Sequence, residues 1–309
     1  MNYKEVREYL HFDEKESFLF MPNEIFKDLP NHIKSNHIPF TYSYNYLITY
    51  LYRYSKYGKK LYTISDIKEI LGYNPNNKDL NYIIKKNGLM DELEYTTTDK
   101  DFPIGWTYED GNLEFDMFSD FKRDYLEGLK VEPYSSMSRN YSVKRPEKAF
   151  HRQSKEDGEY EEGTFYYAWD THQIPLKAFL FCMGNKELEC NAFYIYSFLR
   201  HKNQSFNGYD ISIDKLSRET GMTVSTVKRT LDSLKKFKLI RCKINQAYVH
   251  GLSEDERRAN TYYTNDFDSF SFTAQQYDRA GKMNINKYRE DKAKTEIILD
   301  AIGDIPLFG

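Results

Sequence analysis

The sequence predicts an α+β fold that is mainly helical. Apolar residues between 209 and 243 fall at the spacing of two short helices separated by a Thr-Gly turn. Strand-like spacing follows at 239–244, and residues 260–265 (NTYYTN) have the composition of a returning strand. A related pattern occurs earlier, at residues 42–95. These observations predict two tandem winged-helix domains with a C-terminal helical tail.

The composition is typical of a soluble globular protein. The 309 residues are enough for about two domains of roughly 150 residues, each with its own core. The 28 Tyr and 21 Phe supply area for burial. The N-terminus lacks the apolar run of a signal peptide, and no stretch approaches the roughly 18 apolar residues of a membrane span. We therefore expect a cytoplasmic protein without membrane contact.

Two short aromatic runs, each leading to a proline, mark the starts of the two domains. They are residues 18–26 (FLFMPNEIF) and 165–176 (FYYAWDTHQIPL), and we interpret each as a strand that joins the sheet of its own domain. The predicted organisation is an N-terminal winged-helix domain over 17–131, a polar linker over 132–163, a C-terminal winged-helix domain over 164–267 and a helical tail over 268–309.

The first domain is predicted from an internal repeat. Its matching positions, first copy against second, are Thr63-Ile64-Ser65 and Ser212-Ile213-Asp214, Gly72 and Gly221, and Leu89 and Leu239. Each copy has the pattern of an aromatic-rich helix, a helix, a glycine turn, a second helix and a strand, so the strand of the first copy should begin at Leu89. Alternating apolar residues around Asp110-Gly111 then predict a β-hairpin as its wing.

The linker is polar and changes charge along its length. Its basic residues could lie across phosphates or form a solvated loop, and its last part is acidic. The basic residues are Arg139, Lys144, Arg145, Lys148, Arg152 and Lys155.

The second domain carries the clearest local signals. Thr220 and Gly221 break the first helix. Thr223 stands where an N-cap residue belongs, with a hydroxyl that can accept a backbone N–H. Val224 to Phe237 is therefore predicted to be the recognition helix of a helix-turn-helix.

At these residues the chain resembles a known family. The string DKLSRETGMTVSTVKRTLDSL at 214–234, followed by KLI and later NTYY, is similar to the winged-helix domain of bacterial plasmid and phage replication initiators and of DnaD-like primosome proteins. The resemblance covers residues 190–267. It implies DNA binding, and it implies replication less specifically, because many transcription repressors carry a similar turn.

The charge distribution supports a nucleic-acid partner, although the formal net charge is −3. Residues 191–243 hold eleven Lys or Arg against four acidic residues, so basic charge is concentrated around the recognition helix. Residues 42–95 hold eight basic residues against six acidic ones. The first domain should therefore bind DNA more weakly, or serve as a platform for another protein.

The predicted DNA contacts follow from the geometry of the recognition helix. Ser225, Thr226 and Arg229 should lie near base edges and Lys228 near phosphate, because they face away from its apolar side. An ion pair of Arg229 with Asp232 or Asp210 is the alternative. The remaining predicted contacts are Thr223 at the helix start, Lys235, Lys236 and Lys238 on the DNA backbone, and Arg257 and Arg258 at the base of the wing.

The tail contains one predicted helix, Ile285 to Ile302, whose apolar stripe would dock on its own domain or form a homodimer. The final residues, Asp304-Ile305-Pro306-Leu307-Phe308, resemble the short motif by which bacterial proteins bind the sliding clamp, with Asp304 in place of its usual glutamine. A frayed end with two hydrophobic residues is the simpler interpretation.

Motifs for catalysis are missing from the sequence. It has no P-loop, no dinucleotide fingerprint, no H-E-x-x-H and no G-x-S-x-G, and its seven histidines never form the paired arrangement of a nicking enzyme. Cys182, Cys190 and Cys242 lack C-x-x-C spacing and a nearby histidine cluster, so we expect reduced thiols and no structural zinc. The acidic residues Asp99, Asp101, Glu109 and Asp110 fit a solvated wing. We expect a non-enzyme without a cofactor.

Three functions are compatible with these features. The favoured one is a plasmid or phage replication initiator that binds repeated origin sequences in double-stranded DNA and recruits a host helicase or the sliding clamp. The second is a winged-helix transcription regulator of a mobile element, bound as a dimer to one palindrome. The third is a DnaD-like primosome module with weak, nonspecific DNA binding.

Overall fold

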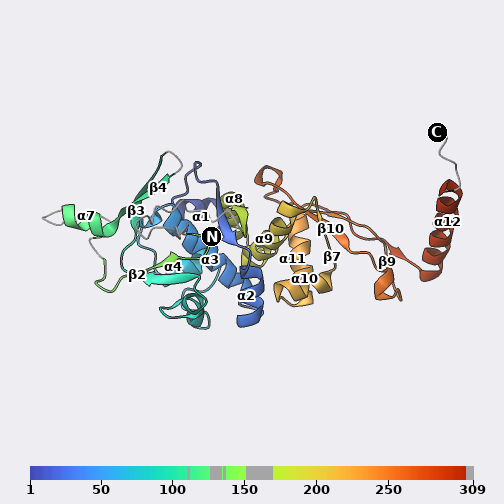
Figure 1. Ribbon diagram of the computed structural model, residues 1–309, viewed down its shortest axis with the longest axis horizontal. Coiled ribbons are helices and arrows are strands. Elements are labelled where there is room, and N and C mark those ends of the chain that lie inside the picture. Colours follow the sequence, from blue (N-terminus) through green and yellow to red (C-terminus); the bar gives the residue numbers. More distant parts are fainter. Residues whose placement is uncertain (110–111, 126–133, 135–136, 151–169, 304–309) are drawn as a thin grey trace, which may run out of the picture.

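The computed structural model describes residues 1–309 apart from 110–111, 126–133, 135–136, 151–169 and 304–309. Its fold is mixed α+β and mainly helical, with several small sheets. Figure 1 shows an elongated molecule, in which the N-terminal half lies at one end and helix α12 (Ile285–Gly303) lies at the other.

The N-terminal half is built around one buried aromatic helix. Every residue of α3 (Ile38–Arg53) is buried, which explains why apolar and aromatic residues occur on all its sides rather than on one stripe. The other elements of this half are α1 (Tyr3–Tyr9), β1 (Phe18–Pro22), α2 (Ile25–His32), α4 (Ile64–Ile70), α5 (Asn81–Ile84), α6 (Leu89–Glu92), β2 (Thr96–Asp99), β3 (Pro103–Glu109), β4 (Asn112–Met117), α7 (Phe118–Tyr125) and β5 (Val143–Pro146).

The C-terminal half follows the same early order of a strand, a short helix and a long helix. These are β6 (Thr171–Pro175), α8 (Leu176–Met183) and α9 (Glu189–Ser205). A three-stranded antiparallel sheet with the order β7-β10-β8 follows, and the helices α10 and α11 connect its strands β7 and β8. The elements involved are β7 (Tyr209–Ile211), α10 (Ile213–Thr220), α11 (Val224–Lys236), β8 (Ile240–Lys243), β9 (Tyr248–Val249), β10 (Asn260–Thr264) and β11 (Lys282–Met283).

The two aromatic prefix strands pair with each other. β1 and β6 are antiparallel, with Leu19 opposite Ile174 and Met21 opposite His172, and all four side chains are buried. The prediction that each strand joins the sheet of its own domain is therefore wrong. Alternate residues of both strands share one buried face, on which the side chains are apolar except for His172, whose two ring nitrogens both have hydrogen-bond partners. In this ribbon β1 packs on α3 and β6 packs on α9.

The two halves share one core. Helix α3 packs on α9, and their buried apolar residues belong to one continuous cluster. The rings of Tyr42 and Tyr194 have centroids 5.4 Å apart, and those of Tyr46 and Phe193 lie 4.9 Å apart. The Tyr46 hydroxyl also donates to the Ile174 carbonyl at 2.9 Å. The expectation of a separate core for each half is not met, because aromatic side chains of both helices fill the same space.

The N-terminal half departs from the predicted repeat after its glycine turn. The second helix is the four-residue α5, and the strand predicted from Leu89 is the helix α6. Residues 89–92 contain no β-branched side chain, and the Asp91 carboxylate accepts the Asn87 N–H at 2.9 Å, which holds a helical turn. The predicted hairpin is present as β3 and β4, with Glu109 opposite Asn112, and its turn residues 110–111 lie outside the described residues.

Part of the predicted linker belongs to the N-terminal half. Strand β5 pairs with β2 antiparallel, and Lys144 on β5 forms a nearly buried ion pair with Asp91 at 2.5 Å. Lys148 pairs with Glu24 at 2.9 Å. These basic side chains are thus occupied by carboxylates, which explains why neither interpretation of the linker applies to them. Arg152, Lys155 and the acidic run lie outside the described residues.

The tail helix forms where it was predicted, and it is attached to the segment between β8 and β10. Strand β11 pairs in parallel with β9, so α12 begins directly beside the loop between β8 and β10. Gln246 Nε2 donates to the Tyr288 hydroxyl at 3.2 Å, and Lys292 lies 3.9 Å from Glu256. The clamp-like motif at 304–308 lies outside the described residues.

Candidate nucleic-acid interface

Local sequence signals position helices α10 and α11. The Ser212 hydroxyl caps α10 by accepting the Lys215 N–H at 3.2 Å, and Gly221 ends it in the left-handed region with φ 67°. The Thr223 hydroxyl accepts the Thr226 N–H at 3.3 Å, which confirms it as the N-cap of α11. The buried apolar residues of the pair and its turn fix the two helices against the sheet and α9; they are Leu216, Met222, Val227, Leu231 and Leu234.

The opposite face of α11 begins with a polar, basic surface. Thr223, Ser225, Lys228 and Arg229 are exposed. Thr226 is half-buried, with its hydroxyl 2.8 Å from that of Thr223. Because Val227, Leu231 and Leu234 on the other side of the helix are buried in the core, the exposed side chains point into solvent, where a ligand can reach them.

Neither of the two carboxylates expected as alternative partners of Arg229 forms an ion pair with it. Asp232 pairs with Lys235, with their charged atoms 2.9 Å apart, and Asp210 lies exposed on β7. Within the described part of the chain Arg229 makes no ion pair. Its guanidinium is therefore available for a ligand.

The far end of α11 is less open than its start. The Lys235 ammonium lies 4.4 Å from the centroid of the Tyr277 ring, and Lys236 lies 3.7 Å from Glu187. The segment after β10 runs along this end, since the Gln275 N–H donates to the Lys236 carbonyl at 2.9 Å. Lys238 stays exposed. The contacts predicted for Lys235 and Lys236 with the DNA backbone would therefore compete with Tyr277 and Glu187 of the protein itself.

Two arginines lie in the loop that leads into β10. Arg257 and Arg258 are both exposed. Arg257 Nε donates to the Leu252 carbonyl at 3.1 Å, and the Arg258 N–H donates to Gln246 Oε1 at 2.9 Å. These bonds fix the loop, and within the described part of the chain most of the guanidinium donors make no hydrogen bond.

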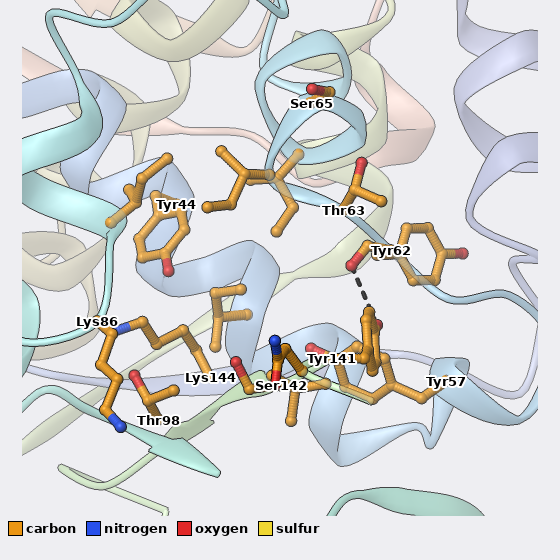
Figure 2. Close-up of a pocket in the computed structure, with 16 residues that line it drawn as sticks. Tyr44, Tyr57, Tyr62, Thr63, Ser65, Lys86, Thr98, Tyr141, Ser142 and Lys144 are labelled. Carbon is orange, nitrogen blue, oxygen red and sulfur yellow. Dashed lines mark hydrogen bonds between the residues drawn. The ribbon is translucent and has the colours of Figure 1, made fainter. Parts of the chain in front are cut away.

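A separate hollow of about 360 Å³ lies in the N-terminal half (Figure 2). The Tyr44 hydroxyl points into it, and the Tyr141 hydroxyl donates to the Tyr62 carbonyl at 3.0 Å. Lys144 at its edge is held by Asp91. No carboxylate or histidine occurs among the described residues that line it, so these side chains offer no acid–base pair.

Sequence reasoning missed the cations that other elements bring beside the helix-turn-helix. Lys27 on α2 shares a crevice with Arg218 on α10, although the two residues lie in different halves of the sequence. Arg218 lies in the 214–234 string and Lys27 in no motif, so only the packing of α10 on α2 reveals that the two residues lie together.

Three comparisons complete the description of the site. Searches against protein-family models, curated proteins and solved structures found no match.

Among the described residues, no group of three or more His, Cys, Asp or Glu side chains could hold a metal ion, and the three cysteines are free thiols. No described helix has the length and apolar character that crossing a bilayer requires.

Proposed function

We propose that this protein binds double-stranded DNA in a sequence-specific manner and initiates replication of a plasmid or phage. The observation that carries the proposal is the exposed start of α11, where Ser225, Lys228 and Arg229 project from a helix whose other face is locked into the core. The order of β7, α10, α11, β8 and β10 supports a winged-helix assignment for the C-terminal half.

The proposed contact places α11 in the major groove. Arg229 and Ser225 read base edges, and Lys228 meets a phosphate. The loop between β8 and β10 brings Arg257 and Arg258 toward the neighbouring minor groove or backbone. The helix and the loop are joined by one small sheet, so they would approach the duplex as a unit.

The N-terminal half supports initiation rather than simple repression. It repeats the early element order of the C-terminal half and is fused to it through the β1–β6 ribbon. A fused tandem unit suits repeated sites along a duplex. Recruitment of a helicase or the sliding clamp through the C-terminal end belongs to the same proposal.

A footprint over the DNA that flanks the protein's own gene tests this function. Protection of direct repeats, together with maintenance of a replicon that carries this DNA and this gene, is the expected result. A single protected palindrome without any effect on replication would indicate a transcription regulator. Salt-sensitive binding without a preferred sequence would indicate a primosome module.

A further inference from the structure

A crevice of about 370 Å³ lies where the two halves meet at the helix-turn-helix. Helices α2, α9 and α10 form its walls, and Figure 1 shows α2 beside the α10–α11 pair. The lining residues are Asn23, Phe26, Lys27, Pro30, Asn31, Phe198, His201, Lys202, Arg218 and Glu219. Both halves of the protein thus contribute to one polar cavity.

The crevice is strongly cationic. Lys27 and Arg218 are exposed and make no ion pair within the described residues, and the Lys202 ammonium lies 5.3 and 5.8 Å from the ring centroids of Phe198 and Tyr209. The single acidic residue of the lining, Glu219, lies 3.6 Å from Lys215 outside the crevice. Three cations therefore line the cavity against one carboxylate, which is shared with Lys215.

Uncharged donors stand beside these cations. His201 makes no hydrogen bond within the described part of the chain, and burial, with Lys202 as the second cause, lowers its pKa to about 4. The imidazole is consequently neutral at pH 7 and has one N–H to donate. The exposed Asn31 amide adds two more donors. Converging N–H donors and cations match the oxygens of a phosphate group.

The position of the crevice relates it to α11. Pro30, which lines the crevice, packs against the turn between α10 and α11, where a Cβ on Gly221 would lie 2.9 Å from the Pro30 Cβ. Arg218 lies one turn before this glycine. A duplex held by the start of α11 therefore passes close to the rim of the crevice.

We propose that this crevice binds a backbone phosphate of the same duplex that α11 engages, so that Lys27 of the N-terminal half becomes part of the DNA interface. The inference rests on the proposed function and adds a second anchoring point to it. It also assigns the α2 surface a role in affinity rather than in base selection.

The test uses the full chain with Lys27→Gln and Arg218→Gln combined. Binding to the footprinted site and to an unrelated duplex is measured by fluorescence anisotropy over a range of salt concentrations. Both affinities should fall by the same factor, about tenfold, and the dependence of log K on log salt should lose a slope of about 2. Lys27→Glu alone should weaken binding more than Lys27→Gln alone.

The matched control removes two exposed lysines elsewhere, Lys4→Gln with Lys100→Gln, which gives the same change in net charge. Thermal unfolding checks that both double variants fold like the unmodified protein. Equal DNA binding by the crevice variant and the control would overturn the inference and leave the proposed function intact. No DNA binding by the unmodified protein would overturn both.

Inorganic phosphate as a probe distinguishes a backbone phosphate of DNA from free phosphate as the ligand of the crevice. If millimolar phosphate raises the melting temperature of the unmodified protein but not of the crevice variant, while their DNA affinities are equal, the crevice takes free phosphate and the DNA assignment is wrong. Competition between phosphate and DNA for the crevice, lost in the variant, is the result expected from the inference.

Discussion

Lys56 and Glu16 form an ion pair with both side chains only 5% exposed. Glu16 also accepts the Tyr50 hydroxyl at 2.8 Å, and the Lys56 ammonium donates to the His11 carbonyl at 2.6 Å. Burial lowers the pKa of Lys56, and the Glu16 charge opposes that shift. The network satisfies both charges, so removing one partner leaves the other buried without compensation.

Glu16→Gln should lower the free energy of unfolding by about 3 kcal/mol, because the Lys56 charge loses its counterion in a buried place. Urea denaturation at neutral pH measures the loss. Glu14→Gln is the matched control, since Glu14 is 58% exposed and pairs with Arg7 and Lys177 at the surface. The control should cost at most about 1 kcal/mol. Equal costs for the two variants would contradict the burial argument.

A second residue-scale prediction concerns two histidines at the junction of the halves. Burial holds the pKa of His172 well below its ordinary value of 6.5, and it lowers that of His201 to about 4. His172 is held neutral between Tyr42 and Asn23, with hydrogen bonds of 2.8 and 3.0 Å. Below pH 6.5 the unfolded chain therefore takes up protons that the folded chain refuses.

Stability should consequently be unaffected by these groups above about pH 6.5 and should fall as the pH drops toward 4. In His201→Gln the decline in the urea midpoint between pH 7 and pH 5 should be shallower than in the unmodified protein. Carboxylates contribute equally to both proteins, so the difference reports the histidine alone. Parallel pH profiles would rule out its titration as a cause.

At the same scale, the sequence predicted the start of α11 better than its end. Thr223 is the N-cap of α11 and accepts the N–H of Thr226, three residues later, so its role follows from local spacing. Lys235 was expected on DNA, yet it contacts Asp232 and the ring of Tyr277, which arrives from a later segment. Helical periodicity cannot predict contacts with residues that are distant in the sequence, such as Tyr277.

At the scale of elements, the β1–β6 ribbon is the feature that sequence patterns misassigned. Each prefix has the alternation of a strand, and alternation identifies the buried face without identifying the neighbouring strand. The helix-turn-helix was predictable because its glycine and its N-caps act within a few residues. The ribbon packs on α3 and α9, which come together only in the shared core.

Leu19→Ala tests the ribbon as a joint between the halves. Leu19 is 1% exposed and opposes Ile174, so its loss should cost about 2–5 kcal/mol of unfolding free energy. Hydrogen exchange should quicken in α9 as well as in α3. Ile64→Ala, at a position 46% exposed, is the control and should change stability by about 0.5 kcal/mol or less. Loss of protection confined to α3 would show that the halves unfold separately.

At the scale of the whole molecule, charge is distributed unevenly over a long body. The chain is acidic in sum, with a formal net charge of −3, whereas the surface around α11 and its crevice is basic. Such asymmetry orients an approaching polyanion toward one face and keeps it from the rest.

Arg229→Ala should weaken binding to the footprinted site by about 1–3 kcal/mol and change binding to unrelated DNA less, because Arg229 is expected on a base edge. Lys228→Gln is the contrasting variant, which should weaken binding to all sequences alike and reduce the salt slope by about 1. Anisotropy titrations on the two duplexes measure both. Equal losses on every sequence in Arg229→Ala would remove its base-reading role.

The parallel pairing of β9 with β11 makes α12 an extension of the loop that carries Arg257 and Arg258. The helix starts two residues after the strand pair, at Ile285, and Tyr288 and Lys292 tie its first turns to the same loop. A displacement of that loop would therefore move the helix with it. In the proposed complex with DNA, binding would therefore reorient α12 at the far end of the molecule, where a second protein could recognise the change without contacting the nucleic acid.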